Sequence, residues 1–264
     1  MDLELEGKTA IVTGGSVGIG KAVALELARE GVDVAICARR PEPLEQAATE
    51  LAQETGRRVV AVPADTGDRA SVEHMVETAY GALGRIDILV NNAAFPGGLV
   101  TGTLAEASEE ALIDDVNTKV MGYFRCAKAV EPHMRRQGWG RIVNIGGTSA
   151  RQGGTISGLR NAAIVHLTKT LSQLLGPAGV TVNLVHPGTT RTERSGPMYE
   201  EQARRQGLTV DEVEARIAEG IAIRRIVDAR EIGYLVCFLA SPKSTCVTGE
   251  VVAAGGGSMN AVYQ

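Results

Sequence analysis

The chain has 264 residues, 44% of them hydrophobic, and a formal net charge of −4. This length predicts a single domain over residues 1–264 with a substantial buried core, because no Pro/Ser-rich linker, low-complexity tract or internal repeat divides it. The small negative charge, without a basic stripe interleaved with aromatic side chains, argues against a nucleic-acid partner.

The amino-terminus and the cysteines predict a reduced, soluble, cytoplasmic protein. The acidic start MDLELEGK has neither the cationic nor the apolar region of a secretory signal, and no apolar run has the length of a membrane span. Cys37, Cys126, Cys237 and Cys246 form no C-x-x-C pair. This spacing favours buried small hydrophobes over a disulfide framework or a zinc site, and we expect no metal.

Short β-branched segments alternate with helical segments along the chain. The expected strands are 9–13, 33–38, 58–64, 86–93, 140–146, 180–188 and 249–257. The expected helices are 20–31, 42–56, 69–84, 109–138, 161–176 and 230–241. The strand segments are apolar throughout, which indicates burial on both faces. The pattern predicts an α/β fold, a doubly wound parallel sheet (Rossmann fold) with helices on both faces.

A glycine-rich turn, TGGSVGIG at residues 13–20, joins the first strand to the first helix. Gly14 permits a tight turn, Gly18 lets the backbone approach a pyrophosphate, and Gly20 allows close helix–strand packing. The free N–H groups at the helix start would face the phosphates. The turn therefore predicts a site for an NAD(P)-type cofactor. An ordinary strand-to-helix turn is the alternative, which the strand–turn–helix context disfavours.

The end of the second expected strand indicates which cofactor is preferred. An acidic residue there would bind the ribose 2′-OH of NAD, whereas an arginine accommodates the 2′-phosphate of NADP. Ala38 stands at this place and is followed by Arg39 and Arg40. We therefore favour NADP, with NAD as the alternative. The competing interpretation is that both arginines are solvated surface charges.

Together with motifs further along, these residues resemble the short-chain dehydrogenase/reductase (SDR) family over almost the whole chain. The segments that match are TGGSVGIG (13–20), Asp65, NNAA (91–94), Asn117, GRIVNIG (140–146) and HPGTTRT (186–192). The resemblance implies an NAD(P)-dependent oxidoreductase acting on a small-molecule substrate. It also implies a homotetramer or homodimer, with the helix at 109–138 and its successor between subunits.

The resemblance also implies a set of cofactor-binding residues. Asp65 and Thr66 would flank the adenine, Asn92 and Ala93 would contact the adenine-side ribose, and the HPGTTRT segment would hold the nicotinamide carboxamide. The full expected set is Gly14, Ser16, Gly18, Ile19, Gly20, Arg39, Asp65, Thr66, Asn92, Ala93, Pro187, Gly188, Thr190 and Thr192.

The catalytic segment departs from the family pattern. The family carries Tyr-x-x-x-Lys at the start of the helix after the fifth strand. The ungapped match of the downstream residues places Ser157 at the tyrosine position and Asn161 at the lysine position. The position of the family's serine reads Gly146–Gly147–Thr148, and only Asn117 matches the family's catalytic set. We therefore expect Asn117, Ser157 and Asn161 at the reacting centre.

This departure matters because carbonyl reduction needs a proton as well as a hydride. A tyrosine hydroxyl has a pKa near ~10, which a neighbouring lysine lowers, whereas a serine hydroxyl is a weaker acid and asparagine carries no charge. The sequence thus predicts a reductase of a ketone or activated double bond with a non-standard proton donor. His186 is one candidate acid, and a structural histidine is the alternative interpretation.

Two other functions stay open, because fold does not determine function. One is a non-redox enzyme on the same scaffold. The other is a binding protein that senses the cofactor. The complete HPGTTRT segment at the nicotinamide end favours the reductase.

Residues 192–226, which we call the lid, are expected to form two short charged helices over the substrate. Met198 and Tyr199 either line an apolar pocket or pack the lid together. An anionic substrate would be met by lid arginines, unless these form solvated helix faces: Arg191, Arg194, Arg204 and Arg205. Tyr263 is expected to reach the site of a neighbouring subunit.

Overall fold

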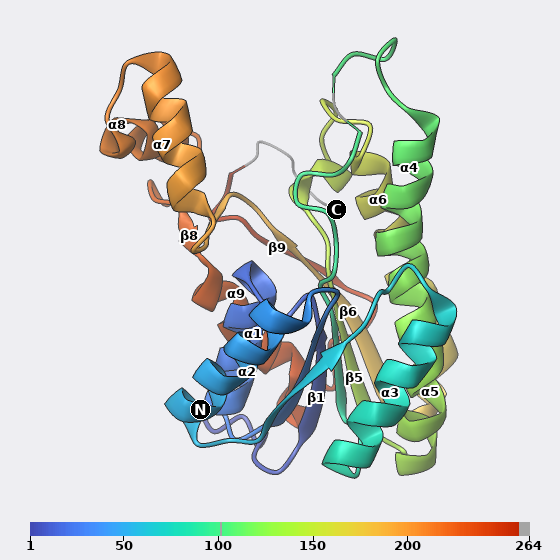
Figure 1. Cartoon of the computed structure of the whole chain (residues 1–264). Coiled ribbons are helices and arrows are strands. Elements are labelled where there is room, and N and C mark those ends of the chain that lie inside the picture. The colour runs from blue at the N-terminus through green and yellow to red at the C-terminus, as the bar shows by residue number, and fades with distance from the viewer. Residues whose placement is uncertain (101, 259–264) are drawn as a thin grey trace.

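A seven-stranded parallel sheet lies at the centre of the molecule (Figure 1). The computed structural model describes residues 1–100 and 102–258, so Tyr263 lies outside the described residues. The strands follow the order β3-β2-β1-β4-β5-β6-β9. Their bounds are β1 Thr9–Thr13, β2 Asp33–Ala38, β3 Val59–Pro63, β4 Ile88–Asn91, β5 Gly140–Ile145, β6 Val180–Pro187 and β9 Val251–Ala254. The predicted doubly wound parallel sheet is confirmed, with one strand in each expected region.

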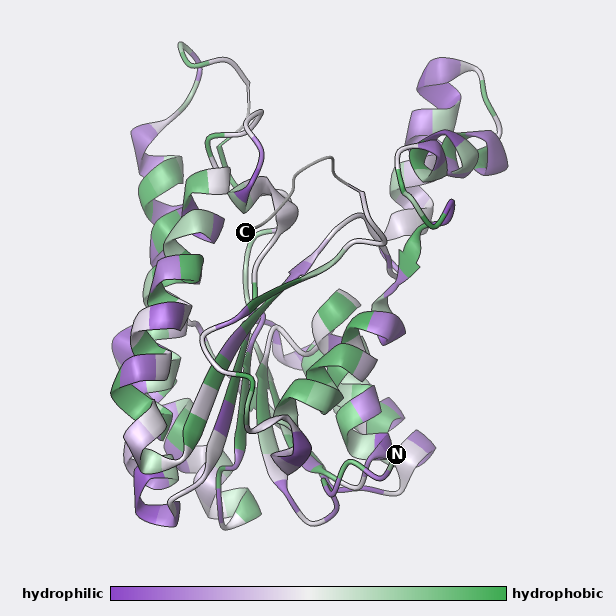
Figure 2. Ribbon diagram, turned by 180° about the vertical axis from the view of Figure 1, so that it is seen from behind, coloured by the Kyte–Doolittle hydropathy of each residue, from purple (hydrophilic) through white to green (hydrophobic). Residues whose placement is uncertain are grey.

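Helices cover both faces of the sheet (Figure 1). One layer holds α1 (Gly18–Arg29), α2 (Pro41–Thr55) and α9 (Ala229–Ala240). The other holds α3 (Arg69–Leu83), α5 (Gly122–Gln137) and α6 (Gly158–Leu175). Figure 2 shows apolar residues along the strands and on the helix faces turned toward them, with polar residues outside. No helix in the described part of the chain is long and apolar enough to span a membrane.

The long helix expected at 109–138 contains a π-helical turn. It consists of α4 (Glu109–Val116), the turn η1 (Asn117–Met121) and α5, which follow one another without a break. A π-helical turn inserts an extra residue into the helix and occurs frequently at functional sites. Here it carries Lys119, whose side chain is buried although the residue type is charged. Sequence periodicity did not predict this turn.

The lid rises beside the carboxyl ends of the strands (Figure 1). Its two helices, α7 (Ser195–Gln206) and α8 (Val210–Glu219), confirm the expected pair. They share a small apolar core that includes Tyr199 and Val213. A two-stranded sheet of β7 (Thr190–Arg191) and β8 (Val227–Asp228) forms the base of the lid. These strands were not predicted, because two residues are too short for a periodic pattern.

Buried polar side chains join the ends of β4 and β5 to α6. Asn91 Nδ2 donates to Asn144 Oδ1 at 2.9 Å, and Asn144 Nδ2 donates to Thr168 Oγ1 at 2.9 Å. None of the three residues is exposed to solvent. Because a buried amide without a partner is costly, these bonds fix α6 against the sheet.

We expect Thr168→Val to lower the free energy of unfolding by about 1–3 kcal/mol, because it leaves the Asn144 amide without its acceptor inside the core. Thr168→Ser keeps the hydroxyl and serves as the control. Urea unfolding of both variants and the unaltered chain, at one protein concentration, measures the difference. Equal values for the valine and serine variants would contradict the assignment.

Candidate active site

One large cavity opens at the carboxyl ends of the strands, next to the point between β1 and β4 where the strand order reverses. Its volume is about 1300 Å³. Open α/β sheets bind ligands at such a point. All but one of the expected cofactor residues line this cavity: Gly14, Ser16, Gly18, Ile19, Arg39, Asp65, Thr66, Asn92, Ala93, Pro187, Gly188, Thr190 and Thr192. Their role in binding stays a prediction.

The exception, Gly20, packs against the glycine turn inside α1. A Cβ at this position would lie 2.2 Å from the Gly14 carbonyl oxygen and 2.4 Å from Asn92 Nδ2. Gly14 and Gly18 have φ angles of +67° and +63°, in the left-handed region that favours glycine. The turn therefore needs glycine at these positions, because a side chain would clash at Gly20 and would strain the backbone at Gly14 and Gly18.

Asn92 holds the same turn from β4. Its Nδ2 donates to the Thr13 carbonyl at 3.0 Å and to the Gly14 carbonyl at 3.2 Å. Thr13 Oγ1 in return accepts from the backbone N–H groups of Asn92 and Ala93. The amide predicted to contact a ribose is therefore directed at the glycine turn, although Asn92 also lines the cavity.

The start of α1 holds an anion in this structure. The Gly18 N–H donates to the lid carboxylate Glu193 Oε1 at 2.5 Å. This carboxylate stands where a phosphate oxygen would bind, because helix N-termini attract negative charge. At the other side, the Arg39 guanidinium lies over the Phe95 ring, 5.0 Å from its centroid. The donors and charges of this half of the cavity fit a phosphorylated dinucleotide.

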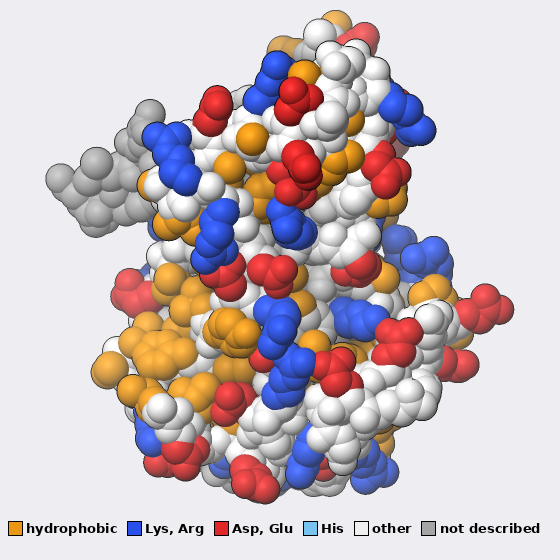
Figure 3. Space-filling view, turned by 90° about the vertical axis from the view of Figure 1, so that its left-hand side faces the viewer, with side chains coloured by type: hydrophobic (Ala, Val, Ile, Leu, Met, Phe, Trp, Pro, Cys, Tyr) orange, Lys and Arg blue, Asp and Glu red, His pale blue; other side chains and the backbone are white. Residues whose placement is uncertain are grey.

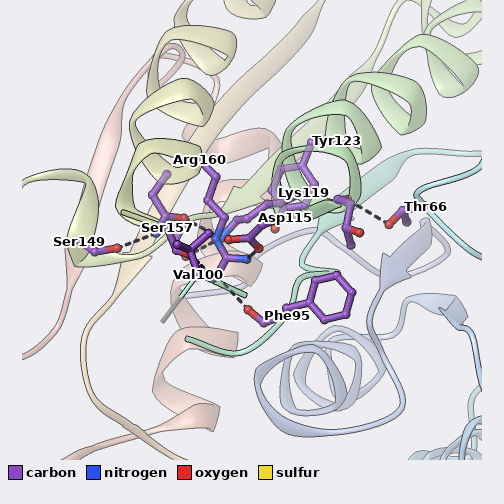
Figure 4. A network of polar contacts seen from close by, with 12 residues as sticks. Thr66, Phe95, Val100, Asp115, Lys119, Tyr123, Ser149, Ser157 and Arg160 are labelled. Atoms are coloured by element: carbon purple, nitrogen blue, oxygen red, sulfur yellow. Dashed lines mark hydrogen bonds and ion pairs between the residues drawn. The ribbon is translucent and has the colours of Figure 1, made fainter. Parts of the chain in front are cut away.

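The same cavity is also lined by a buried lysine, Lys119 (Figure 4). Lys119 Nζ donates to Asn161 Oδ1 at 2.7 Å and to the Gly146 carbonyl at 3.0 Å. Asn161 Nδ2 donates to Ser149 Oγ at 2.8 Å. Burial, reinforced by the neighbouring Arg160, lowers the pKa of Lys119 to about 7. The three side chains line the cavity in contact with one another.

Ser157 lies at the N-terminal end of α6, beneath the loop that follows β4. Its Oγ accepts from the Val100 N–H at 3.2 Å (Figure 4). The loop is so close that a Cβ on Gly98 would lie 2.2 Å from the Ser157 side chain. The structure thus brings Ser157 and Asn161 to the same cavity, but the Ser157 oxygen holds the loop.

The side chain of Asn117 is directed elsewhere. Its Nδ2 donates to the Gly67 carbonyl at 3.2 Å, and its Oδ1 accepts from Arg125 Nη2 at 2.8 Å. Asn117 does not line the cavity. The structure therefore does not bring this amide together with Ser157 and Asn161.

A buried ion pair lies beside Lys119. Arg160 Nη1 pairs with Asp115 Oδ1, and Arg160 Nη2 donates to the Phe95 carbonyl at 2.8 Å. Neither side chain of the pair is more than 6% exposed. With Lys119 in its charged form, the cluster holds two cations and one anion, and so carries a net positive charge. Among residues 1–100 and 102–258, no group of three or more His, Cys, Asp or Glu side chains is arranged to hold a metal ion.

His186 is contradicted as the acid. Its Nδ1 accepts from the Gly147 N–H at 2.9 Å, and the residue is fully buried. Burial, followed by the charges of Arg151 and Lys119, lowers its pKa to about 4. The imidazole is therefore neutral at pH 7, which favours the alternative that His186 is a structural histidine.

Comparison with known proteins identifies the family. The family model for enoyl-(acyl carrier protein) reductase matches residues 14–259. The chain belongs to the short-chain dehydrogenase/reductase family. It is 39% identical to the oxidoreductase UcpA of Salmonella typhimurium, over 97% of this chain and 95% of that protein. It is 30% identical to the NADPH-dependent reductase BacG of Bacillus subtilis, over 97% and 99% of the two chains.

A solved SDR structure shares the fold. The L-sorbose reductase of Gluconobacter frateurii, complexed with NADPH and L-sorbose, matches with a TM-score of 0.93 and 28% identity. The match covers 99% of this chain and 100% of that chain. The protein is thus an oxidoreductase of the SDR type.

The lid of this SDR directs few charges into the cavity. Arg191 pairs with Glu214, and Arg204 and Arg205 both pair with Glu201. Figure 3 views the molecule from the side on which the lid stands in Figure 1, and it shows basic and acidic side chains interspersed over that side. Of the arginines expected to meet an anionic substrate, only Arg194 lines the cavity, next to Met198. Tyr199 instead belongs to the lid core.

Sequence reasoning missed three polar residues of this SDR site: Lys119, Ser149 and Arg160. The place of each residue in the site depends on contacts between segments that are far apart in the chain. A signal was present at Lys119, because a lysine two residues after Asn117 interrupts the apolar face of a long helix.

We expect Glu193→Gln to tighten NADPH binding. The substitution removes a negative charge that competes with the pyrophosphate at the start of α1, an effect of about 0.3–1 kcal/mol, or about two- to fivefold in Kd. Fluorescence titration measures the change. Glu200→Gln, an exposed carboxylate on α7 outside the cavity, is the matched control. Equal or weaker binding by the Glu193 variant would contradict the assignment.

Proposed function

We propose that this protein is an NADPH-dependent reductase of a ketone or an activated carbon–carbon double bond, with a proton donor other than the family's tyrosine. One observation carries the proposal. A single cavity is lined by an anion-binding helix start and Arg39 and also by a buried lysine, Lys119.

The residues that would hold the cofactor follow from their places in the cavity. The backbone at Gly18 and Ile19 would bind the pyrophosphate, and Arg39 the 2′-phosphate. Asp65 and Thr66 would lie against the adenine. The segment from Pro187 to Thr192 would hold the nicotinamide. NADPH supplies the hydride when it is bound.

The reacting end of the cavity favours chemistry that builds up negative charge. Because Arg160 and Asp115 neutralise each other, the charge of Lys119 is left to stabilise an oxygen that becomes anionic. Hydride addition to a ketone produces such an oxygen, and so does addition to a double bond conjugated with a carbonyl. Closure of the lid would exclude water from this end.

Two of the relatives support NADPH as the cofactor. BacG is named an NADPH-dependent reductase, and the L-sorbose reductase structure contains NADPH. The family model carries the name of an enoyl reductase, which supports a conjugated double bond as one substrate class.

We also propose that the chain forms a homodimer or homotetramer. Large apolar side chains stand exposed on α4, α5 and α6, among them Ile113, Phe124 and Leu159. Burial between subunits would remove this apolar surface from water.

The function is tested by adding NADPH or NADH to the purified protein with panels of ketones, enones and quinones. Loss of the absorbance of the reduced nicotinamide reports turnover. We expect turnover with NADPH on at least one panel. Tight NADPH binding with no turnover on any panel would contradict the proposal and favour a non-redox enzyme or a cofactor-sensing protein.

We expect Arg39→Ala to weaken NADPH binding by about tenfold and to leave NADH binding unchanged, because a charge-assisted hydrogen bond contributes about 1.5–3 kcal/mol and Arg39 is exposed. Arg57→Ala is the matched control: Arg57 pairs with Asp33 at the far end of β2 and lies outside the cavity. Isothermal titration with both cofactors measures the effect. Equal losses for NADPH and NADH would show that Arg39 does not read the 2′-phosphate.

A further inference from the structure

We propose that Lys119 is the proton donor of this reaction. The inference rests on the proposed reductase function and deepens it. It names the group that donates the proton, a role for which Ser157 and Asn161 are poorly suited.

The geometry gives Lys119 a proton to deliver. An ammonium has three N–H donors. Two acceptors of Lys119 Nζ lie within the protein, the Gly146 carbonyl at 3.0 Å and Asn161 Oδ1 at 2.7 Å. Lys119 also lines the cavity, although its residue is only 3% exposed. These two bonds use two of the three donors, and we infer that the third serves the cavity that Lys119 lines, away from bulk solvent.

Asn161 suits this arrangement because it carries no charge. Its carbonyl accepts from Lys119, while its Nδ2 donates to Ser149 Oγ at 2.8 Å. These two bonds fix the orientation of the amide. A lysine at position 161 would place a second ammonium next to the first, with strong repulsion in a buried site. The site thus holds its ammonium on η1 and an acceptor for it on α6.

The charges around Lys119 bring its proton affinity into the useful range. Burial, followed by the charge of Arg160 on α6, lowers the pKa of Lys119 to about 7, and Asp115 on α4 opposes them more weakly. His186 on β6 is neutral at this pH, because its own pKa is lowered to about 4 by burial, by Arg151 and by Lys119. An acid whose pKa lies near the working pH is the most effective donor.

Tyr123, a tyrosine beside Lys119, does not compete for the role. Tyr123 on α5 lies beside Lys119, whose Nζ is 5.8 Å from the ring centroid. Its hydroxyl donates to the Ile145 carbonyl at 2.8 Å, and burial raises its pKa far above the usual range. Tyr123 does not line the cavity, so its proton stays within the core.

The step balances as follows. Hydride from NADPH, which would be oxidised to NADP⁺, forms the new C–H bond. In a ketone the electron pair of the C=O bond moves onto oxygen. In an enone the C=C pair forms a new C=C bond next to the carbonyl, and the C=O pair moves onto oxygen. One N–H bond of Lys119 breaks, its electron pair stays on Nζ, and its proton forms the O–H bond of an alcohol or enol. Lys119 becomes a neutral amine, and solvent water restores its proton after product leaves.

Three variants test the role. Lys119→Met removes the donor, and we expect kcat to fall on the order of 10²–10⁴-fold. Lys119→Arg keeps the charge, and with it the stabilisation of the anionic oxygen, but does not release a proton near neutrality, so we expect its kcat to stay far below that of the unaltered chain. Lys128→Met removes an exposed lysine from α5 and is expected to match the unaltered chain. Recovery of kcat by Lys119→Arg would overturn proton donation.

The pH profile separates donation from support of the fold. The charged form of Lys119 is the active form, so kcat of the unaltered chain should fall as pH rises through about 7. The residual rate of Lys119→Met should lack this dependence. A profile unchanged by the substitution would overturn the proposal.

A measurement without turnover decides the same question. Lysine labelled with ¹³C at Cε is incorporated, and the Lys119 signal is the one lost in Lys119→Met. We expect its NMR titration midpoint near 7. A midpoint near ~10.4, the value of an unperturbed lysine, would overturn the role of Lys119 even if the protein proves to be a reductase. Failure of the unaltered chain to oxidise NADPH would overturn the proposed function, and the role with it.

Discussion

The hydrogen bond from the buried Lys119 ammonium to Asn161 is the interaction on which the reacting end of this site depends. A charge inside a protein is stabilised only by close partners. Lys119 finds them on two other segments, at Asn161 on α6 and at Gly146 after β5. The π-helical turn η1, the end of β5 and the start of α6 therefore meet at one atom. These hydrogen bonds of Lys119 hold the three segments together at the wall of the cavity.

The two ends of the cavity differ in how closely they follow the family. At the cofactor end, the glycine turn and Arg39 line the cavity as predicted, whereas the Asn92 amide holds the glycine turn. The reacting end is built from other residues. The Ser157 oxygen holds the loop after β4, and Lys119 on η1 donates a hydrogen bond to Asn161. A cradle for a nicotinamide cofactor is thus combined with a different source of positive charge.

The fold was predictable because its signals are local. Apolar strand segments, helical periodicity and the glycine turn each lie within a few residues, and all seven strands of the central sheet were found from them. The lid helices were found in the same way. The acid role left open for His186 was wrong, because the sequence does not show that its Nδ1 accepts a backbone N–H and that the ring is fully buried.

The reacting end was not predictable, since its contacts join distant segments. Lys119 and Asn161 are 42 positions apart, and Arg160 and Asp115 are 45. Nothing in the local sequence of either helix indicates the other. The direction of the Asn117 amide, toward Gly67 and Arg125, also depends on tertiary packing. Sequence motifs predicted that Ser157 and Asn161 depart from the family pattern, and three-dimensional packing brings Lys119 into contact with Asn161.

The central claim is our proposal that this cavity moves a hydride with Ser157 and Asn161 at the positions predicted for the family's tyrosine and lysine. The most direct measurement follows deuterium from NADPH labelled at the transferable C4 position into the product. The account predicts product that carries one deuterium on the reduced carbon, in proportion to the NADPH consumed, detected by mass spectrometry. Product formed without deuterium, or formed with no NADPH consumed, would contradict the account and assign the cofactor a structural role.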